Sequence, residues 1–133
     1  MRGMQHSRPP PPPPPLKVLA RQLQASQGVT HARLPPMLGS SVWLQADVIT
    51  VKDGGDEAIL SDGSATFRAV QLRSAPGADR AAVKGKYVLV YGILQSHSPD
   101  PVVKAIKMMS LSDNPFHKHM WKDEVLELQQ YML

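Results

Sequence analysis

Histidines are the first side chains to weigh for metal chemistry in this chain of 133 residues, because it contains no cysteine. His117 and His119 lie two residues apart, so on a helix they would point roughly 160° away from each other and could not chelate one ion. The other three, His6, His31 and His97, are scattered along the chain. A zinc site needs several ligands that converge on one ion. We therefore predict no metal site and no cofactor.

Carboxylates and small polar residues offer no recognisable catalytic pattern either. Four aspartates cluster in the sequence, but three of them flank predicted turns, where Asp is favoured for backbone reasons; they are Asp47, Asp53, Asp56 and Asp62. The Gly54-Gly55 pair lacks the Lys-Ser/Thr that follows in a phosphate-binding loop. No serine lies in a nucleophile-elbow pattern. The sequence therefore predicts a protein that is not an enzyme.

The charge of the chain is unevenly distributed, which limits a nucleic-acid interpretation. The formal net charge is +4, yet residues 1–46 hold five basic residues and no acidic one, whereas residues 47–133 hold ten basic and eleven acidic residues. The predicted body is therefore close to neutral and lacks the cationic surface that dominates DNA affinity. No apolar run approaches the length of a membrane span. The absence of cysteine fits a reducing compartment such as cytosol or nucleus.

Two segments precede the predicted sheet. Residues 1–15 end in seven consecutive prolines and are predicted to be a disordered, proline-rich leader. The simplest role for this leader is a stiff spacer, although the spacing of Arg8, Pro11 and Pro14 also fits a groove of the SH3 type. Strong helix formers and the spacing of Leu19 and Leu23 then predict a short amphipathic helix over residues 16–23.

Alternating apolar and polar residues predict five strands in the rest of the domain, which spans residues 16–133. The predicted strands cover residues 42–51, 58–60, 65–72, 86–96 and 102–111. Tight turns follow the first two strands, and Gly92 lies where a curved barrel strand often needs a kink. We therefore predict an all-β fold with flanking helices: a five-stranded OB-fold barrel, a short N-terminal helix and a C-terminal helix. An SH3-like barrel is the alternative, but the long fourth strand and the helix directly after the fifth favour the OB fold.

Aromatic residues are few for a barrel that would bind single-stranded nucleic acid by stacking. The predicted strands hold Trp43, Phe67, Tyr87 and Tyr91, with Phe67 expected in the core. Packing or partner contact explains the others better than a stacking platform. A stand-alone OB protein that binds single strands remains the alternative function.

The C-terminal helix, predicted over about residues 114–132 with Asn114 as its cap and Pro115 in its first turn, has a broad apolar face. At 100° per residue, four apolar side chains fall within an arc of about 60°; they are Trp121, Val125, Leu128 and Met132. Three more continue the apolar face beside that arc: Phe116, Met120 and Tyr131. Such a face exceeds what a surface helix needs against its own domain, and Trp, Tyr and Met are enriched in interface cores. It predicts a docking surface, unless both chain ends fold back and cover it.

Several motifs of the chain resemble those of the RecQ-mediated genome instability protein 2 family. The similarity covers most of residues 15–128, and its motifs are Pro15 to Leu23, Gly85-Lys86-Tyr87-Val88, Gln95-x-x-Ser98-Pro99, Ala105-x-Lys107-Met108 and Leu111-Ser112-Asp113-Asn114-Pro115, followed by Trp121. The family is also similar to the middle subunit of replication protein A, whose OB barrel ends in an assembly helix.

The resemblance implies a nuclear scaffold subunit with weak or no DNA binding of its own. Its expected partner is the C-terminal OB domain of RecQ-mediated genome instability protein 1, and through it Bloom syndrome helicase and topoisomerase III alpha. That assembly dissolves double Holliday junctions without crossover. The resemblance places Lys17 and Trp121 at the partner interface. Helical geometry adds Val125, Leu128 and Met132 to the expected partner-binding residues.

Overall fold

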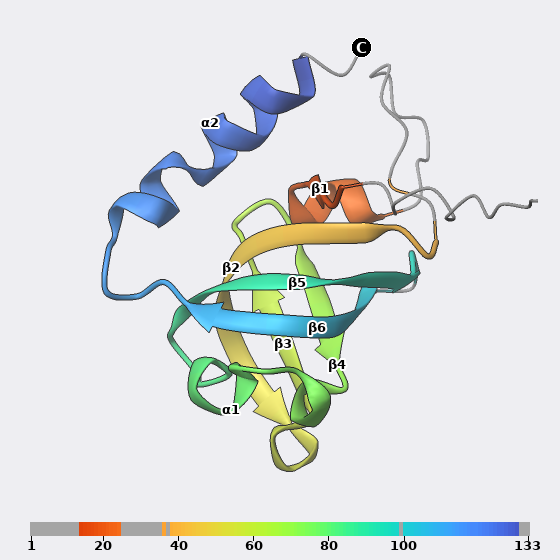
Figure 1. Cartoon of the computed structure of the whole chain (residues 1–133), viewed down its shortest axis with the longest axis vertical. Coiled ribbons are helices and arrows are strands. Elements are labelled where there is room, and N and C mark those ends of the chain that lie inside the picture. Colours follow the sequence, from red (N-terminus) through yellow and green to blue (C-terminus); the bar gives the residue numbers. More distant parts are fainter. Residues whose placement is uncertain (1–13, 25–35, 37, 99, 131–133) are drawn as a thin grey trace, which may run out of the picture.

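Five long strands close into a barrel in the computed structural model, which describes residues 14–24, 36, 38–98 and 100–130 (Figure 1). The strands are β2 (Ser41–Lys52), β3 (Glu57–Ser61), β4 (Thr66–Val70), β5 (Tyr87–Ser96) and β6 (Val102–Ser110). Strand β2 pairs with β5 through its first half and with β3 through its second half. A parallel pairing of β4 with β6 and an antiparallel pairing of β6 with β5 complete the circuit. The predicted five-stranded barrel is confirmed.

The barrel interior follows from the alternation of residues along its strands. Val42, Leu44, Ala46 and Val48 of β2 point inward and are fully buried, as their period of two predicts. Phe67 of β4 fills the interior, also as expected. A short helix, α1 (Ala78–Ala81), follows β4 and precedes β5 in the chain, and it packs against β6.

The prediction of an N-terminal helix is wrong. Residues 16–23 form instead a two-residue strand, β1 (Leu16–Lys17), parallel to β2, and a 3-10 turn, η1 (Ala20–Leu23). The reason is that a helix would place Leu19 and Leu23 on one face, whereas the fold needs them in different clusters. Leu23 lies in the barrel core, and Leu19 packs against Trp121 outside the barrel.

Gly92 allows two strands to approach closely. The register between β5 and β6 shifts between Tyr91 and Gly92, where β6 has an extra residue, Ile106. A Cβ atom at position 92 would collide with the backbone carbonyl of Lys104. The expected irregularity in this strand is therefore present, and it depends on the missing side chain.

The C-terminal helix, α2 (Phe116–Gln130), begins as the sequence predicts. The side chain of Asn114 accepts a hydrogen bond of 3.0 Å from the backbone N–H of Phe116, two residues after the cap. The end predicted near residue 132 lies outside the described residues, as does the leader up to residue 13. Within the described ranges, no helix is both long enough and apolar enough to span a bilayer.

Candidate partner-docking surface

Helix α2 lies on the outer face of β2 and is held there by a small apolar cluster (Figure 1). Trp121 is 3% exposed and Val125 is fully buried, and both pack with Leu19. Trp43 and Leu126 lie partly buried against the same cluster. We call these five residues the helix seat. The predicted apolar face is therefore partly used by the chain's own fold.

Polar contacts fix both ends of α2 on the barrel. Near the start of the helix, Lys118 Nζ lies 2.9 Å from Asp47 Oδ2 on β2. Further along, Lys17 Nζ lies 2.7 Å from Glu124 Oε2, and Gln129 Nε2 donates to the backbone oxygen of Lys17 at 3.2 Å. Because Lys17 pairs with Trp43 at the beginning of β2, α2 runs back along β2 in the opposite direction.

The aromatic side chains on the outside of the barrel gather beside this helix. The rings of Trp43 and Tyr91 meet edge to face at 5.9 Å. The Tyr87 hydroxyl donates to Gln45 Oε1 at 3.0 Å, and the ammonium group of Lys118 lies 5.7 Å from the centre of the Tyr87 ring. Burial, followed by the nearby charge of Asp47, raises the pKa of Tyr87 well above its ordinary value. These rings pack beside α2 and do not form a platform on which nucleic-acid bases could stack.

Strands β3 and β4 are the second and third barrel strands, whose outer face binds oligonucleotides in many OB folds. Within these two strands the one aromatic residue is Phe67, which points inward. The positive charge of Arg68 lies next to an acid, with Nε 3.2 Å from Glu57 Oε2. This face therefore lacks both the rings and the free cations that single-strand binding requires.

The described histidines and aspartates serve structural roles or face solvent, while His6 and His31 lie outside the described residues. Asp56 Oδ1 accepts from the backbone N–H of Arg73, and Asp62 Oδ2 accepts from that of Ala20. A ring nitrogen of His97 lies 2.7 Å from the backbone oxygen of Leu23. Over the described part of the chain, no three His or acidic side chains come close enough to hold a metal ion.

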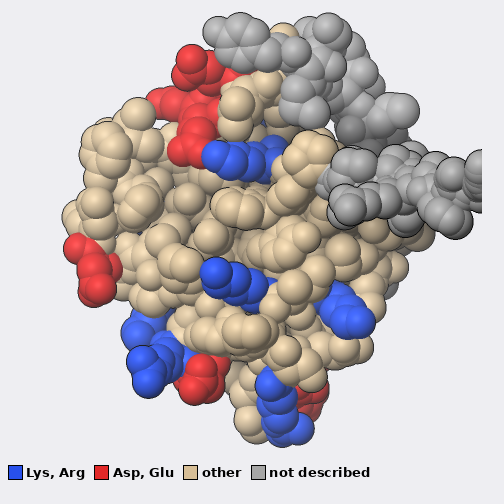
Figure 2. Space-filling view, in the orientation of Figure 1, with Lys and Arg blue, Asp and Glu red and all other residues tan. Residues whose placement is uncertain are grey.

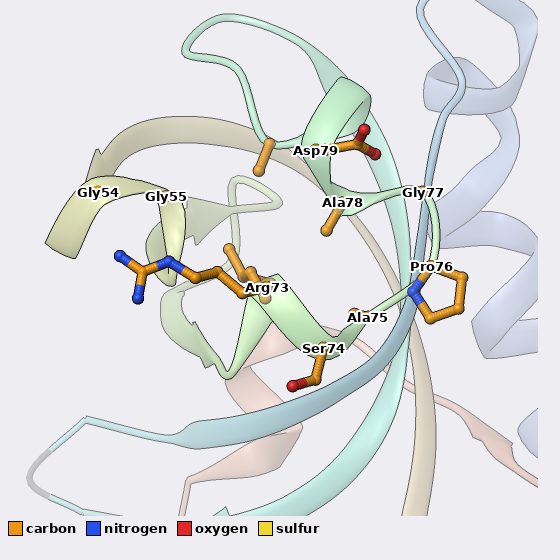
Figure 3. A pocket seen from close by; sticks show the side chains of 11 residues that line it. Gly54, Gly55, Arg73, Ser74, Ala75, Pro76, Gly77, Ala78 and Asp79 are labelled. Carbon is orange, nitrogen blue, oxygen red and sulfur yellow. The ribbon is translucent and has the colours of Figure 1, made fainter.

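A hollow of the described surface lies at the end of the barrel away from α2, between the β2–β3 turn and α1. It is an open groove of about 640 Å³, lined largely by glycine, alanine and proline. Arg73 reaches across it toward Gly54 and donates to the backbone oxygen of Asp53 at 2.7 Å (Figure 3). Because this arginine is engaged by backbone, the groove offers no convergent set of polar groups for a ligand.

A strip of apolar side chains on α2 remains exposed after the helix has docked. Phe116 is 61% exposed, Met120 38% and Leu128 41%. We call these three residues the apolar strip. On the face drawn in Figure 2, acidic side chains gather near the second half of the helix and basic ones are spread over the barrel. Helix α2 itself also carries Lys118 and Lys122. An exposed group of large apolar residues on a terminal helix is typical of an interaction site.

The structure brings together three of the five predicted partner-binding residues. Lys17, Trp121 and Val125 meet around the helix seat, Leu128 is exposed beside it, and Met132 lies outside the described residues. Sequence reasoning missed the pairing of Lys17 with Glu124, which are 107 residues apart. No local pattern signals such a contact, because it depends on how β1 and α2 meet in space.

Comparison with known proteins gives a consistent family match. The sequence profile of RecQ-mediated genome instability protein 2 matches residues 14–129. The chain is 41% identical over 125 residues to the chicken (Gallus gallus) protein of that name, covering 86% of this chain and 91% of the relative. It is 40% identical over 126 residues to the bovine (Bos taurus) protein, covering 88% and 79% respectively.

Solved structures of proteins with much lower sequence identity have a similar fold. A chain of the S. pombe Stn1–Ten1 complex aligns with a TM-score of 0.66 at 15% identity, covering 89% of this chain and 94% of that one. A chain of a replication protein A heterotrimer bound to single-stranded DNA aligns with a TM-score of 0.63 at 17% identity, covering 90% and 98%. Both alignments extend over nearly the whole chain.

Proposed function

Because the chain belongs to the RecQ-mediated genome instability protein 2 family, we propose that it is a non-catalytic scaffold subunit which pairs with a second OB-fold protein. The proposed partner is the C-terminal OB domain of RecQ-mediated genome instability protein 1. Through that partner the subunit would stabilise a nuclear assembly of Bloom syndrome helicase and topoisomerase III alpha. The reaction served is the dissolution of double Holliday junctions without crossover.

The observation that carries this proposal is the apolar strip, which stays exposed although α2 is already docked. Phe116, Met120 and Leu128 remain 38–61% exposed in the described fold, while Trp121 and Val125 of the same helix are buried in the helix seat. Large apolar and aromatic side chains are the residues that dominate interface energies. The names of the structural neighbours, a Stn1–Ten1 complex and a replication protein A heterotrimer, describe assemblies of several chains.

The five predicted partner-binding residues would act in two ways. Leu128 and Met132 would contact the partner directly, together with the rest of the apolar strip. Lys17, Trp121 and Val125 would act mainly by holding α2 in the position that the partner recognises, because they are engaged by the chain's own fold. A rigidly held helix avoids the entropic cost of ordering on binding.

The direct test is a double substitution in the apolar strip, Met120→Ala with Leu128→Ala, assayed by calorimetric titration with the partner domain. Alanine favours helix, so α2 should remain formed while the apolar contact is lost. We expect the affinity to fall by at least tenfold. The matched control is Ile49→Ala, since Ile49 of β2 is exposed to a similar degree, 45%, but lies outside α2. Equal affinities of the double variant and the wild type would refute the proposed surface.

Single-strand binding is the competing function. Titration of the isolated chain with an oligonucleotide at low salt separates it from scaffolding. We expect no binding tighter than about 100 μM, since non-specific contacts of a nearly neutral body are few. Micromolar or tighter affinity with a steep salt dependence would overturn the scaffold-only interpretation.

A further inference from the structure

The 3-10 turn η1 begins without a side-chain cap of its own. The residue before it, Leu19, has an apolar side chain that cannot accept a hydrogen bond. The first N–H groups of a helical turn have no acceptor within that turn, and here they belong to Ala20 and Arg21. Ala20 is fully buried, so a missing acceptor would be costly there. This segment therefore requires acceptors from elsewhere in the chain.

The turn between β3 and β4, residues 62–65, supplies these acceptors. Asp62 Oδ2 accepts from the backbone N–H of Ala20 at 2.7 Å, across 42 positions of the sequence. Ser64 Oγ accepts from the backbone N–H of Arg21 at 3.1 Å. The second carboxylate oxygen, Asp62 Oδ1, accepts from the backbone N–H of Ser64 at 2.9 Å and from its hydroxyl at 2.6 Å. Asp62 thus uses one oxygen to shape its own turn and the other to hold η1, which lies beside that turn in Figure 1.

The segment that Asp62 holds is also the segment that contacts the second half of α2. Gln22 Nε2 donates to Gln129 Oε1 at 2.8 Å, and Gln129 Nε2 donates to Gln22 Oε1 at 2.9 Å. Gln22 Oε1 also accepts from the backbone N–H of Leu19 at 2.9 Å, so the amide that reaches α2 is itself fixed on η1. Leu19 packs against Trp121 and Val125 in the helix seat. A continuous series of contacts therefore joins the β3–β4 turn, η1 and α2.

We infer that Asp62 is a positioning residue for partner binding, which fixes α2 through η1. Among the described residues, no hydrogen bond or ion pair joins Asp62 to α2 itself. Release of the Ala20 N–H would free η1 to shift, together with Leu19 and Gln22, which contact the helix. Partner binding would then have to order α2, and this cost lowers the affinity. The inference rests on the proposed function and names a barrel residue that controls the same docking surface.

The experiment is a double-mutant cycle in the full chain with Asp62→Asn and Gln129→Ala, in which calorimetric titration measures the affinity for the partner OB domain. Asparagine has the size of aspartate but one acceptor oxygen, so it cannot hold both the turn and η1. We expect each single variant to lose about fivefold in affinity, as for one lost hydrogen bond. The double variant should lose about fivefold as well, because either substitution breaks the same series of contacts. Independent sites would instead give the product of the two losses.

The matched control is Asp56→Asn, which makes the same chemical change in the β2–β3 turn. Asp56 Oδ1 also accepts from a backbone N–H, that of Arg73, at 3.0 Å. Like Asp62, Asp56 is half-buried, but the segment that it holds does not include η1. The control should bind the partner within about twofold of the wild type, the spread expected for an uncoupled site.

Hydrogen exchange of the free chain separates positioning from a general loss of fold. In Asp62→Asn the amides of α2 should exchange faster, whereas those of β2, β5 and β6 should stay as protected as in the wild type. If Asp62→Asn unfolds the barrel, Ser64→Ala replaces it in the cycle, because it removes the acceptor of the Arg21 N–H and keeps that of Ala20. That variant should lose about twofold to threefold in affinity, again without adding to the loss from Gln129→Ala.

Three results would overturn the inference while the proposed function stands. The first is a wild type that binds the partner and an Asp62→Asn variant that binds equally well. The second is a double variant in which the two single losses multiply, since Asp62 would then act on the partner independently of α2. The third is a weakened Asp62→Asn variant whose α2 exchanges no faster than in the wild type. If the wild type does not bind the partner, the proposed function itself fails and the inference fails with it.

Discussion

Replacing Trp121 by alanine tests the link between the helix seat and partner binding most directly. Trp121 is 3% exposed and packs with Leu19 and Val125 between α2 and the barrel. Removal of a buried Trp side chain from a core typically costs about 3–5 kcal/mol. Within the described residues its indole N–H has no acceptor, so the cost comes from lost packing rather than a lost hydrogen bond. A loss of this size exceeds what the two ion pairs of α2 can offset, at about 1 kcal/mol each or less.

We therefore expect Trp121→Ala to release α2 while the barrel stays folded, because the barrel core is a separate cluster. Hydrogen exchange should show lost protection over residues 116–130 and retained protection in β2, β5 and β6. The chain has two tryptophans, so fluorescence of the variant reports on Trp43 alone and should shift toward the red as its ring is uncovered. Partner affinity should fall by at least about 2 kcal/mol, or roughly 30-fold.

Trp121→Phe provides the graded control, because it keeps an aromatic ring in the seat and should retain most of the affinity. The reasoning would be refuted if Trp121→Ala left both the protection of α2 and the affinity unchanged. It would also be refuted if affinity fell while α2 stayed fully protected, since the seat would then not act through the position of the helix.

Two further predictions concern polar contacts around α2. Lys17→Glu should weaken partner binding by up to about fivefold in a calorimetric titration, because the ion pair with Glu124 is partly exposed. Adding Glu124→Lys to the same chain should restore the affinity. If the second substitution does not restore the affinity, the ion pair is excluded as the cause. The raised pKa of Tyr87 means that its phenol stays neutral in the folded protein at a pH where the unfolded chain ionises. This group should therefore leave the free energy of unfolding unchanged below pH 10, the ordinary pKa of tyrosine, and should lower it as the pH rises above that value. Urea titrations at several pH values should show a shallower fall of the unfolding free energy for Tyr87→Phe than for the wild type. Equal dependence on pH in the two proteins would contradict the raised pKa of Tyr87.

The strands and turns were predictable because their signals are local. Alternation in β2 identified its inward side chains, and the Asn114 cap located the start of α2. The segment before the barrel was mispredicted because its helix propensity is overridden by two separate apolar clusters, which take Leu19 and Leu23 in different directions. Propensity is a weak prior when tertiary contacts compete.

The candidate site was only half predictable for a related reason. Helical periodicity identified which residues of α2 are apolar, but it could not show which of them the barrel would cover. Trp121 and Leu128 fall in the same predicted arc, yet the first is buried and the second is 41% exposed. The difference arises from β1 and η1, which bring Leu19 and Lys17 against one flank of the helix.

The contrast between buried Trp121 and exposed Leu128 explains how substitutions at either residue can weaken partner binding. A helix of 15 residues is marginal in water by itself. The apolar strip is therefore presented in a fixed geometry only while the helix seat and its two ion pairs hold α2 on β2. Substitutions in the seat should consequently reduce the rate of association and the protection of α2 together. Substitutions in the strip should increase the rate of dissociation with α2 still protected, because they remove contacts without freeing the helix.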